Sequence, residues 1–457
     1  METLDYSVKL PLYRDVDVLV VGAGPAGIAA AVSAARNKAK VFVFDKWGCA
    51  GGMATMGGVG PFMTSFDSSG KNQIIRGIFE ELVQAMKAMG GAIHPKEIRG
   101  ECSYSGYYKL GHDHVGPFDH EPFKIAAAEM IQESGAEMLL HTNFVDVLME
   151  KNRIGGVVIS NKAGVAAVKA KVVIDCTGDG DVAVRAGESF DLGREDGNIQ
   201  AATLFFRVCN VDTDKMDAHM KEHANEIRPF FGPYSWLIRE KSAEWEGINR
   251  AEVCLFQNPT KGEFRMNVTR ILDIDGTKPE DLTRAEIEGT KQAVKAFKFL
   301  KKYAPGFENA HFMGTAAAVG IRETRHIHGK HWLTGEEAEN CLVPDTSIAV
   351  FATNIDTHNK NDVQGTFITI QKGPYYGVPY GCLVPKKTAN LLLAGRHISA
   401  DAVAASSTRM MPCCMALGQA AGTAAALSAQ TGLSPIDLDV RKLRALLMEQ
   451  GAYLGAE

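Results

Sequence analysis

Three glycines near the start of the sequence have the spacing of a phosphate-binding turn. Gly22, Gly24 and Gly27 form a G-x-G-x-x-G pattern between the apolar run Val16–Val21 and an alanine-rich segment that ends at Asn37. The first glycine of such a pattern makes a tight turn, the second lets a diphosphate approach the backbone, and the third lets the following helix pack closely. The amides and the dipole of a helix N-terminus favour negative charge. The pattern therefore predicts a site for a dinucleotide diphosphate.

Asp45 lies where a carboxylate could bind the ribose of a dinucleotide. Asp45 closes a second apolar run, Val41–Phe44, 18 residues after Gly27. A carboxylate at this point can accept hydrogen bonds from both ribose hydroxyls and would repel a 2′-phosphate. Because strand, glycines, helix, strand and acid occur in this order, we expect a βαβ unit rather than only a tight turn.

Arginines further along the sequence could recognise an anionic group. Arg322 and Arg325 lie within Gly320–His328, and a guanidinium group suits a carboxylate or another planar oxyanion. For each arginine, a solvated strand edge or a salt bridge with Glu323 is an equally good interpretation. The sequence leaves these alternatives open.

A histidine-rich segment could be interpreted as a metal site. It contains His112, Asp113 and His114, with His120 nearby, but residues 100–117 are rich in Gly, Tyr and Ser and have no clear period. We therefore expect a loop over the active site and no metal.

Apolar periodicity predicts the elements that must position these residues. We expect helices over Ile74–Met89, from Asp119 to about Gly135, and over Pro412–Ala429, where small residues permit close backbone approach. Between residues 138 and 176, apolar runs alternate with turn signals, which predicts an antiparallel meander that leads into a buried strand, Val172–Cys176.

The middle of the sequence has longer spacings and mixed elements. We expect strands over Ala201–Val208 and Phe264–Thr269 and a charged helix over Thr290–Tyr303, which Pro305 and Gly306 end. This change of pattern between about 190 and 385 predicts a second, substrate-facing domain.

Further segments carry a resemblance to a known family. Gly51–Thr55 offers backbone amides just after Asp45, the strand Val172–Cys176 runs into Thr177–Asp181, and a late apolar strand leads into Gly395–His397. Together with the glycine pattern, these segments resemble FAD-dependent oxidoreductases with the glutathione-reductase type of Rossmann domain, most closely their fumarate-reductase-like branch. The resemblance covers the first sixty residues and roughly residues 138–187 and 385–428.

The resemblance implies an α/β fold. It would be an FAD-binding, Rossmann-like, three-layer domain of glutathione-reductase type with a β-meander, plus an inserted α+β substrate domain. We expect residues 1–190 and 385–457 to form the FAD-binding domain and residues 191–384 to form the substrate, or cap, domain.

The resemblance also implies a set of contacts with non-covalently bound FAD, from the pyrophosphate to the isoalloxazine ring. The implied residues are Gly22, Gly24, Pro25, Ala26, Gly27, Asp45, Lys46, Gly52, Met53, Ala54, Thr55, Val145, Thr177, Gly178, Asp181, Gly395, Arg396 and Gly418. Asp45 would contact the adenosine ribose, and Val145 would lie by the adenine. The helix after Pro412 would point its N-terminus at the flavin, where its dipole stabilises the anion formed by two-electron reduction.

Catalytic candidates follow from the same resemblance. His397 is the favoured acid or electrostatic stabiliser, and Arg409 would neutralise a substrate oxyanion, with help from Arg322 and Arg325. A histidine at position 397 that only hydrogen-bonds a flavin carbonyl is an equally good interpretation.

Some features depart from relatives in this class. Cys49 has no partner cysteine before Cys102, so dithiol chemistry is not supported, and no histidine precedes His94 to attach a flavin covalently. We prefer a small structural cysteine at position 49 to a covalent flavin link. No second glycine pattern lies in a βαβ unit, so a dedicated NAD(P) domain is not expected.

These observations favour an oxidoreductase that transfers a hydride between flavin N5 and a small organic, anionic or carbonyl-bearing substrate, as a dehydrogenase or ene-reductase. An oxygen-activating hydroxylase or oxidase is an alternative. A second alternative is an electron-transfer flavoprotein subunit without a small substrate of its own. The sequence does not identify the electron donor or acceptor.

Composition and cysteine spacing argue against several other classes of protein. The 457 residues include 49 Lys and Arg against 54 Asp and Glu, a net charge of −5, so no overall basic charge favours nucleic acid or an anionic membrane. Nine scattered cysteines without a C-x-x-C pair argue against a disulfide framework or a zinc site. Residues 1–15 mix charged with apolar residues and no apolar run reaches eighteen residues, so we expect neither a signal peptide nor a membrane span. We expect a soluble, cytoplasmic protein, with homo-oligomerisation left open.

Overall fold

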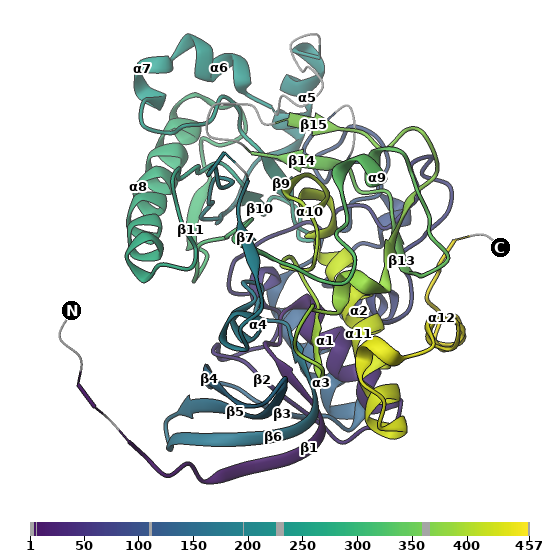
Figure 1. Cartoon of the computed structure of the whole chain (residues 1–457). Helices are drawn as coiled ribbons and strands as arrows, with labels where there is room; N and C mark the ends of the chain where they lie inside the picture. The colour runs from purple at the N-terminus through teal and green to yellow at the C-terminus, as the bar shows by residue number, and fades with distance from the viewer. Residues whose placement is uncertain are drawn as a thin grey trace.

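A seven-stranded sheet gathers segments from both ends of the chain (Figure 1). The computed structural model describes residues 4–5, 7–108, 112–194, 196–224, 233–358 and 366–455. Five parallel strands lie in the order β3 (Glu137–Leu139), β2 (Val41–Phe44), β1 (Leu12–Val21), β6 (Gly164–Asp175) and β17 (Leu391–Leu393). β5 (Arg153–Asn161) and β4 (Asn143–Glu150) continue from the first part of β6 as antiparallel strands. The βαβ unit and the meander predicted from the sequence are confirmed.

The central strands are continuous apolar runs because neighbouring elements cover both of their faces. Val18–Val21 and all four residues of β2 are almost completely buried. Parallel strands in such positions lack the alternation of apolar and polar residues that marks a half-exposed strand.

Helices α1 (Pro25–Arg36) and α11 (Met411–Thr431) pack directly against each other beside the sheet. A Cβ atom added at Gly418 would lie 2.1 Å from the carbonyl oxygen of Ala26, and one at Gly422 would lie 2.3 Å from that of Ala30. The backbones can approach this closely only because glycine has no side chain. The predicted small-residue helix is therefore confirmed, with its packing partner.

Two further helices cover the same region, and one of them differs from its prediction. α3 (His120–Ser134) ends at Gly135 as expected, whose φ of 89° suits glycine. α2 (Ile78–Ala88) begins four residues later than predicted, because Gly77 has a φ of 61° and interrupts the helical backbone.

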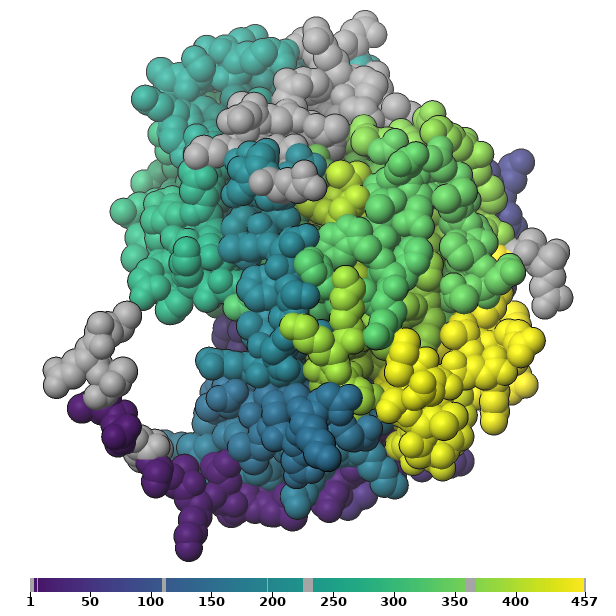
Figure 2. Space-filling model, in the orientation of Figure 1, coloured from purple at the N-terminus to yellow at the C-terminus, as the bar shows by residue number. Residues whose placement is uncertain are grey.

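A separate antiparallel sheet is built from the middle of the chain. Its strand order is β11 (His311–Thr315), β8 (Phe206–Cys209), β10 (Phe264–Met266) and β9 (Leu255–Gln257). Around it lie α5 (Thr213–Glu222), α6 (Ser235–Glu240), α7 (Ser242–Trp245) and α8 (Pro279–Tyr303). These teal segments form the upper lobe, at the upper left of Figures 1 and 2, and the lower lobe contains the seven-stranded sheet at the bottom of Figure 1.

The predicted boundaries in this lobe need correction. α8 begins at Pro279, eleven residues before the predicted Thr290, because Pro279 and the acidic Glu280 and Asp281 form its first turn. The strands are shorter than predicted, and Ala202 and Thr203 make isolated bridges with Ile271 and Gly320 instead of continuing β8.

Short strand pairs form separate two-stranded sheets. β7 (Phe190–Leu192) pairs with β12 (Arg325–Ile327), β13 (Ser347–Phe351) with β16 (Tyr376–Pro379), and β14 (Ile355–Thr357) with β15 (Thr366–Ile368). The remaining helices are α4 (Asp181–Arg185), α9 (Gly335–Glu339), α10 (Ala402–Thr408) and α12 (Val440–Glu449). In the residues described, the 3-10 turns are η1 (Gly52–Ala54), η2 (Pro95–Glu97), η3 (Tyr380–Leu383) and η4 (Pro435–Asp437).

A buried arginine ties the upper lobe to the lower one. Arg265 of β10 is 1% exposed and donates hydrogen bonds to the carbonyl oxygens of Val59, at 2.9 Å, and Phe118. Its guanidinium lies 4.4 Å from the centre of the Phe118 ring, a cation–π contact. A Cβ at Gly60 would lie 1.7 Å from Nη1, so glycine makes room for this arginine.

Within the described part of the chain, no single helix has the length and apolar composition to cross a membrane. The pair α10 and α11 meets both criteria only when taken together, across a 91° bend.

Candidate active site

A cavity of about 740 Å³ lies between the two lobes. Its lower side is formed by the loops that follow β1, β2, β6 and β17, at the carboxyl ends of the parallel strands. Its upper side is formed by the segments before β8 and β9, by β9, β14 and β15, by the start of α8 and by the segment before β12. Open α/β sheets bind ligands at this edge.

The three glycines of the first turn each meet a different physical demand. Gly22 has a φ of 99°, and a Cβ there would lie 2.6 Å from the carbonyl oxygen of Cys176. A Cβ at Gly27 would lie 1.8 Å from the carbonyl oxygen of Gly22, whereas a Cβ at Gly24 would meet nothing within 4 Å. Gly24 lines the cavity, so its missing side chain leaves open space for a ligand.

The N-terminus of α1 beside Gly24 suits a diphosphate. No side chain caps the helix, and its first turn contains no acidic residue. The unsatisfied amides and the positive end of the helix dipole therefore remain available to an anion. The same applies to α11, which has neither a side-chain cap nor an acidic residue in its first turn. Met410, Met411 and Cys414 of this second helix start also line the cavity.

Asp45 lies at the end of β2 and lines the cavity beside Lys46. Its carboxylate accepts hydrogen bonds from the backbone N–H groups of Ala23 (2.7 Å) and Trp47 (2.9 Å), which fix its orientation. Burial raises the pKa of Asp45, and these amides oppose that rise. The side chain is therefore held in place at the cavity wall.

The loop after β6 forms an ionic cluster at the centre of the cavity wall. Asp179 accepts a hydrogen bond from Arg396 at 2.5 Å and another from the Thr324 hydroxyl at 2.8 Å. Burial raises the pKa of Asp179, but Arg396 outweighs it and leaves the pKa below its ordinary value. Arg325 instead binds Asp181 at 2.8 Å.

Most of the residues implied by the resemblance meet at this cavity. Those that line it are Gly22, Gly24, Pro25, Ala26, Asp45, Lys46, Gly52, Met53, Thr177, Gly178, Asp181, Gly395, Arg396, Arg322 and Arg409. Those outside its lining are Gly27, Ala54, Thr55, Val145, Gly418, Arg325 and His397. Gly27 and Gly418 pack backbone against backbone instead, and Val145 is 40% exposed while its neighbour Phe144 lines the cavity.

His397 differs most from its predicted role. Its side chain is completely buried, with Nε2 3.6 Å from Asp175 Oδ1, and it does not line the cavity. The backbone at Gly395 has a φ of 126°, and the next residue, Arg396, takes the place on the wall. Burial lowers the pKa of His397. This geometry does not bring His397 to a substrate.

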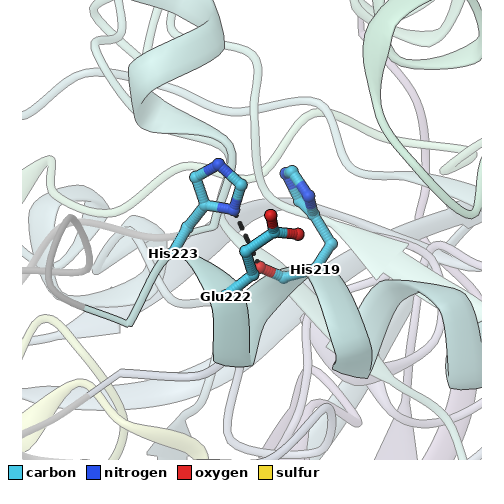
Figure 3. A group of neighbouring side chains, drawn as sticks. All are labelled: His219, Glu222 and His223. Atoms are coloured by element: carbon cyan, nitrogen blue, oxygen red, sulfur yellow. Dashed lines mark hydrogen bonds between the residues drawn. The ribbon is translucent and has the colours of Figure 1, made fainter.

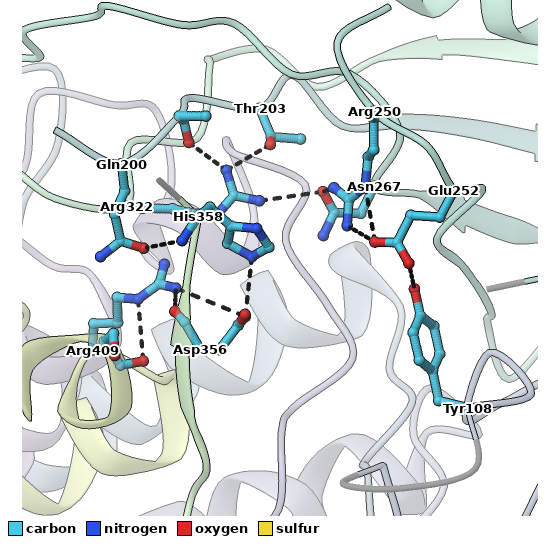
Figure 4. Close-up of polar contacts among 12 residues, drawn as sticks. Tyr108, Gln200, Thr203, Arg250, Glu252, Asn267, Arg322, Asp356, His358 and Arg409 are labelled. Carbon is cyan, nitrogen blue, oxygen red and sulfur yellow. Dashed lines mark hydrogen bonds and ion pairs between the residues drawn. The ribbon is translucent and has the colours of Figure 1, made fainter. Parts of the chain in front are cut away.

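Three guanidinium groups gather at the upper end of the cavity (Figure 4). Arg322 donates to the Ala201 carbonyl at 2.6 Å, the Thr203 hydroxyl at 2.7 Å and Asn267 Oδ1 at 3.4 Å. All three acceptors are uncharged, and Arg322 makes no ion pair with any described residue. Burial, together with Arg409 and Arg250, lowers the pKa of Arg322 to about 9.

The other two arginines have carboxylate partners. Arg250 pairs with Glu252 at 2.6 Å, and the Tyr108 hydroxyl donates to the same carboxylate at 3.0 Å. Arg409 donates to the Asp356 carbonyl at 2.9 Å and lies 3.9 Å from its carboxylate. The cluster in Figure 4 therefore contains three guanidinium groups against two carboxylates.

A histidine–carboxylate pair completes the cluster. His358 Nε2 lies 3.1 Å from Asp356 Oδ2, and its backbone N–H donates to Gln200 Oε1 at 3.3 Å. Burial lowers the pKa of His358 to about 4, so the imidazole is neutral at pH 7. Burial alone would raise the pKa of Asp356, but His358, Arg409 and Arg322 outweigh it and lower the pKa.

Arg250, Glu252, Asp356 and His358 are not among the residues predicted from the sequence. A signal was present, because Arg-x-Glu and Asp-x-His each place two polar side chains on one face of an extended segment. Their segments are short and lie far from the glycine pattern, so the spacing alone did not single them out.

In the histidine-rich segment, the described His112 and His114 make separate contacts. His112 lines the cavity, lies 5.5 Å from the Phe256 ring and donates from Nδ1 to the Ser105 carbonyl. His114 stacks on Phe66 and donates to the Pro95 carbonyl. The placement of His112 agrees with a loop beside the site.

Comparison with known proteins identifies a family for most of the chain. A family model described as "FAD dependent oxidoreductase" matches residues 17–447. The thiamine thiazole synthase of Pyrococcus horikoshii is 28% identical over 192 residues, 39% of this chain and 66% of that protein. The one from Methanococcus maripaludis is 30% identical over 193 residues, 40% of this chain and 63% of that protein. These matches span less than two thirds of either relative.

Two solved structures illustrate more distant similarity. A geranylgeranyl bacteriochlorophyll reductase-like protein from Thermoplasma acidophilum is 14% identical with a TM-score of 0.45, over 96% of this chain and 84% of that one. A flavin-dependent brominase is 13% identical with a TM-score of 0.46, over 95% and 83% of the two chains. Similarities of this size do not assign an activity.

Proposed function

The chain belongs to the FAD-dependent oxidoreductase family, and we propose that it transfers a hydride between bound FAD and a small organic anion. Its enzyme class and its cofactor follow from the family. The substrate and the direction of the reaction belong to the proposal.

We assign the two lobes to different tasks. Residues 1–190 and 385–457 would hold FAD, and residues 191–384 would hold the substrate. The assignment is supported by the sheet, because β17 returns from the far end of the sequence to pair with β6. Two expectations stay predictions: membership of a fumarate-reductase-like branch and the cytoplasmic location. The electron donor or acceptor and the oligomeric state stay open.

The lower end of the cavity fits FAD. The open space at Gly24 and the uncapped start of α1 suit the diphosphate, and the oriented carboxylate of Asp45 suits the ribose. The start of α11 would place a positive helix end near the flavin ring. When bound there, FAD supplies two-electron chemistry, and the protein supplies position and electrostatics. We favour non-covalent binding, since Cys49 is outside the cavity lining.

The proposal of an anionic substrate rests on the contacts of Arg322. A buried guanidinium with only uncharged acceptors is costly, because burial penalises its charge, and Asp356 offsets that charge without forming an ion pair with it. A carboxylate or another oxyanion would supply that charge and could be held by two parallel hydrogen bonds. Arg409, which lies beside Asp356 in Figure 4, would contact the same anion.

His358 is the group we assign to proton transfer. Its neutral imidazole is oriented by Asp356, the arrangement in which a carboxylate fixes one ring nitrogen and leaves the other for a substrate proton. A bound anion would raise the pKa of His358 from about 4 toward neutrality, because negative charge favours the protonated ring. His358 would then accept or return a proton while the hydride moves.

The test is an anaerobic screen for bleaching of the oxidised flavin absorbance. Small carboxylates, enones and neutral amines would be compared at equal concentration. We expect carboxylates to bleach the flavin if the enzyme is a dehydrogenase, and carboxylate-bearing enones to reoxidise chemically reduced enzyme if it is an ene-reductase. Equal activity with neutral amines would contradict the anion site. Oxygenated product formed from the reduced enzyme in air would contradict simple hydride transfer.

A further inference from the structure

A His-x-x-Glu-His sequence lies at the C-terminal end of α5, outside the cavity described above. It consists of His219, Glu222 and His223 (Figure 3). Each residue offers one ligand atom, and these three atoms lie within 4.8 Å of one another. Two imidazoles and a carboxylate at this separation can be bridged by a single ion after small side-chain rotations.

The helix itself creates this arrangement. Positions i and i+4 lie one above the other on a helix, which places His219 next to His223, and position i+3 adds Glu222 to the same side. Met216 and Met220 bury the neighbouring face in the core of the upper lobe. The three polar residues therefore lie at the margin between core and solvent, with the Glu222 carboxylate between the two rings in Figure 3.

Aromatic neighbours and a backbone carbonyl restrict the rings. The His223 ring stacks on Trp236 with ring centres 4.9 Å apart and an interplanar angle of 3°. The His219 ring lies 5.9 Å from that of Tyr234 at 17°. His223 Nδ1 donates to the His219 carbonyl at 3.0 Å, so its Nε2 keeps the lone pair that a metal needs. Metal-binding histidines commonly have this second hydrogen bond to a carbonyl.

The electrostatic setting favours a cation. The last carbonyl groups of a helix carry the negative end of its dipole, and the site lies on the last turn of α5. Glu222 is exposed and adds a negative charge, while both histidines are half-buried. An ion at this position would keep access to water for its remaining ligand.

We propose that His219, Glu222 and His223 bind one zinc-class divalent ion, with water as the fourth ligand. Imidazole nitrogen together with carboxylate oxygen suits Zn²⁺, whereas Mg²⁺ and Ca²⁺ prefer oxygen ligands alone. The ion would fix the last turn of α5 against Trp236. This site is independent of the proposed redox reaction.

The test is zinc binding by the untagged, full-length protein with FAD bound, in competition with a chromophoric chelator. We expect one Zn²⁺ per wild-type chain and loss of this ion in the double variant H219N/H223N. E222Q should weaken zinc binding by at least about tenfold. Loss of an outer-shell partner already costs about that much, and Glu222 is proposed as a direct ligand.

H331N is the matched control. It removes a histidine from another histidine–carboxylate pair, His331 with Glu337 at 3.1 Å, and should keep the wild-type zinc affinity. Equal zinc binding by wild type and H219N/H223N, or no stoichiometric zinc on the wild type, overturns the proposal. If the double variant folds poorly, E222Q decides alone, because its exposed side chain can change without disturbing the core, and an unchanged affinity there also overturns the site.

Discussion

The two ends of the cavity are built in different ways. The lower end relies on backbone: glycines, helix starts and loops that follow parallel strands. The upper end relies on long charged side chains from separate segments, such as Arg250, Arg322 and Arg409. A backbone site suits a large ligand common to many enzymes, whereas a side-chain site can change its specificity by substitution. From this difference we expect binding of the cofactor and choice of substrate to be separable in this protein.

The strongest test of that comparison is G24V. A valine side chain would fill the open space at Gly24 and block the approach of the diphosphate, so the purified variant should retain almost no FAD. Flavin absorbance per chain measures this loss. A88V, which makes a similar change at an exposed alanine at the end of α2, should retain FAD fully. Normal flavin content in G24V would refute the assignment of the lower end.

The next largest effect is expected for H358N at the upper end. Loss of a positioned proton acceptor should slow flavin reduction by roughly 10²- to 10⁴-fold while FAD stays bound. Stopped-flow absorbance under anaerobic conditions gives the rate. H331N, whose histidine pairs with Glu337 away from the cavity, is the control. A rate within twofold of wild type would remove His358 from the mechanism.

The substitutions R322M and R409M should have a smaller effect, which we expect in kcat/KM for reduction of the flavin by the substrate. Each loses a charge-assisted hydrogen bond to the substrate anion, which corresponds to about 10- to 100-fold in kcat/KM. Flavin content should not change, because both residues belong to the upper end. K298M, at a lysine of α8 outside the cavity, serves as control. Loss of FAD in either arginine variant would show that the two ends are not separable.

The smallest expected effect is on the pH dependence of the free energy of unfolding. The pKa of His358 is lowered to about 4 by burial, against about 6.5 in an unfolded chain. Between these values the unfolded state binds a proton that the folded state does not, so the free energy of unfolding falls as the pH decreases. One such histidine accounts for roughly 2 kcal/mol between pH 7 and pH 5. Urea unfolding at both pH values should show a smaller difference in H358N, and an equal difference would contradict the buried neutral histidine.

The sequence predicted the lower end of the cavity better than the upper end, for a physical reason. Gly22, Gly24 and Asp45 belong to one local βαβ unit, so their spacing along the chain determines their spacing in the structure. Arg322 and Asp356 meet only through the tertiary fold, and no local pattern fixes their distance. His397 was assigned from its place beside Gly395, but the direction of its side chain depends on the turn at that glycine.

The packing of α1 against α11 has a consequence for synthesis of the chain. Ala26 and Gly418, which touch in the folded protein, are 392 positions apart. At roughly 5 to 20 residues per second, a ribosome needs about 20 to 80 s to make the second helix after the first. During that interval the apolar face of α1 that α11 will cover has no native partner. Chaperones that bind nascent chains therefore have this interval in which to bind the apolar face of α1, the helix to whose start we assign the diphosphate.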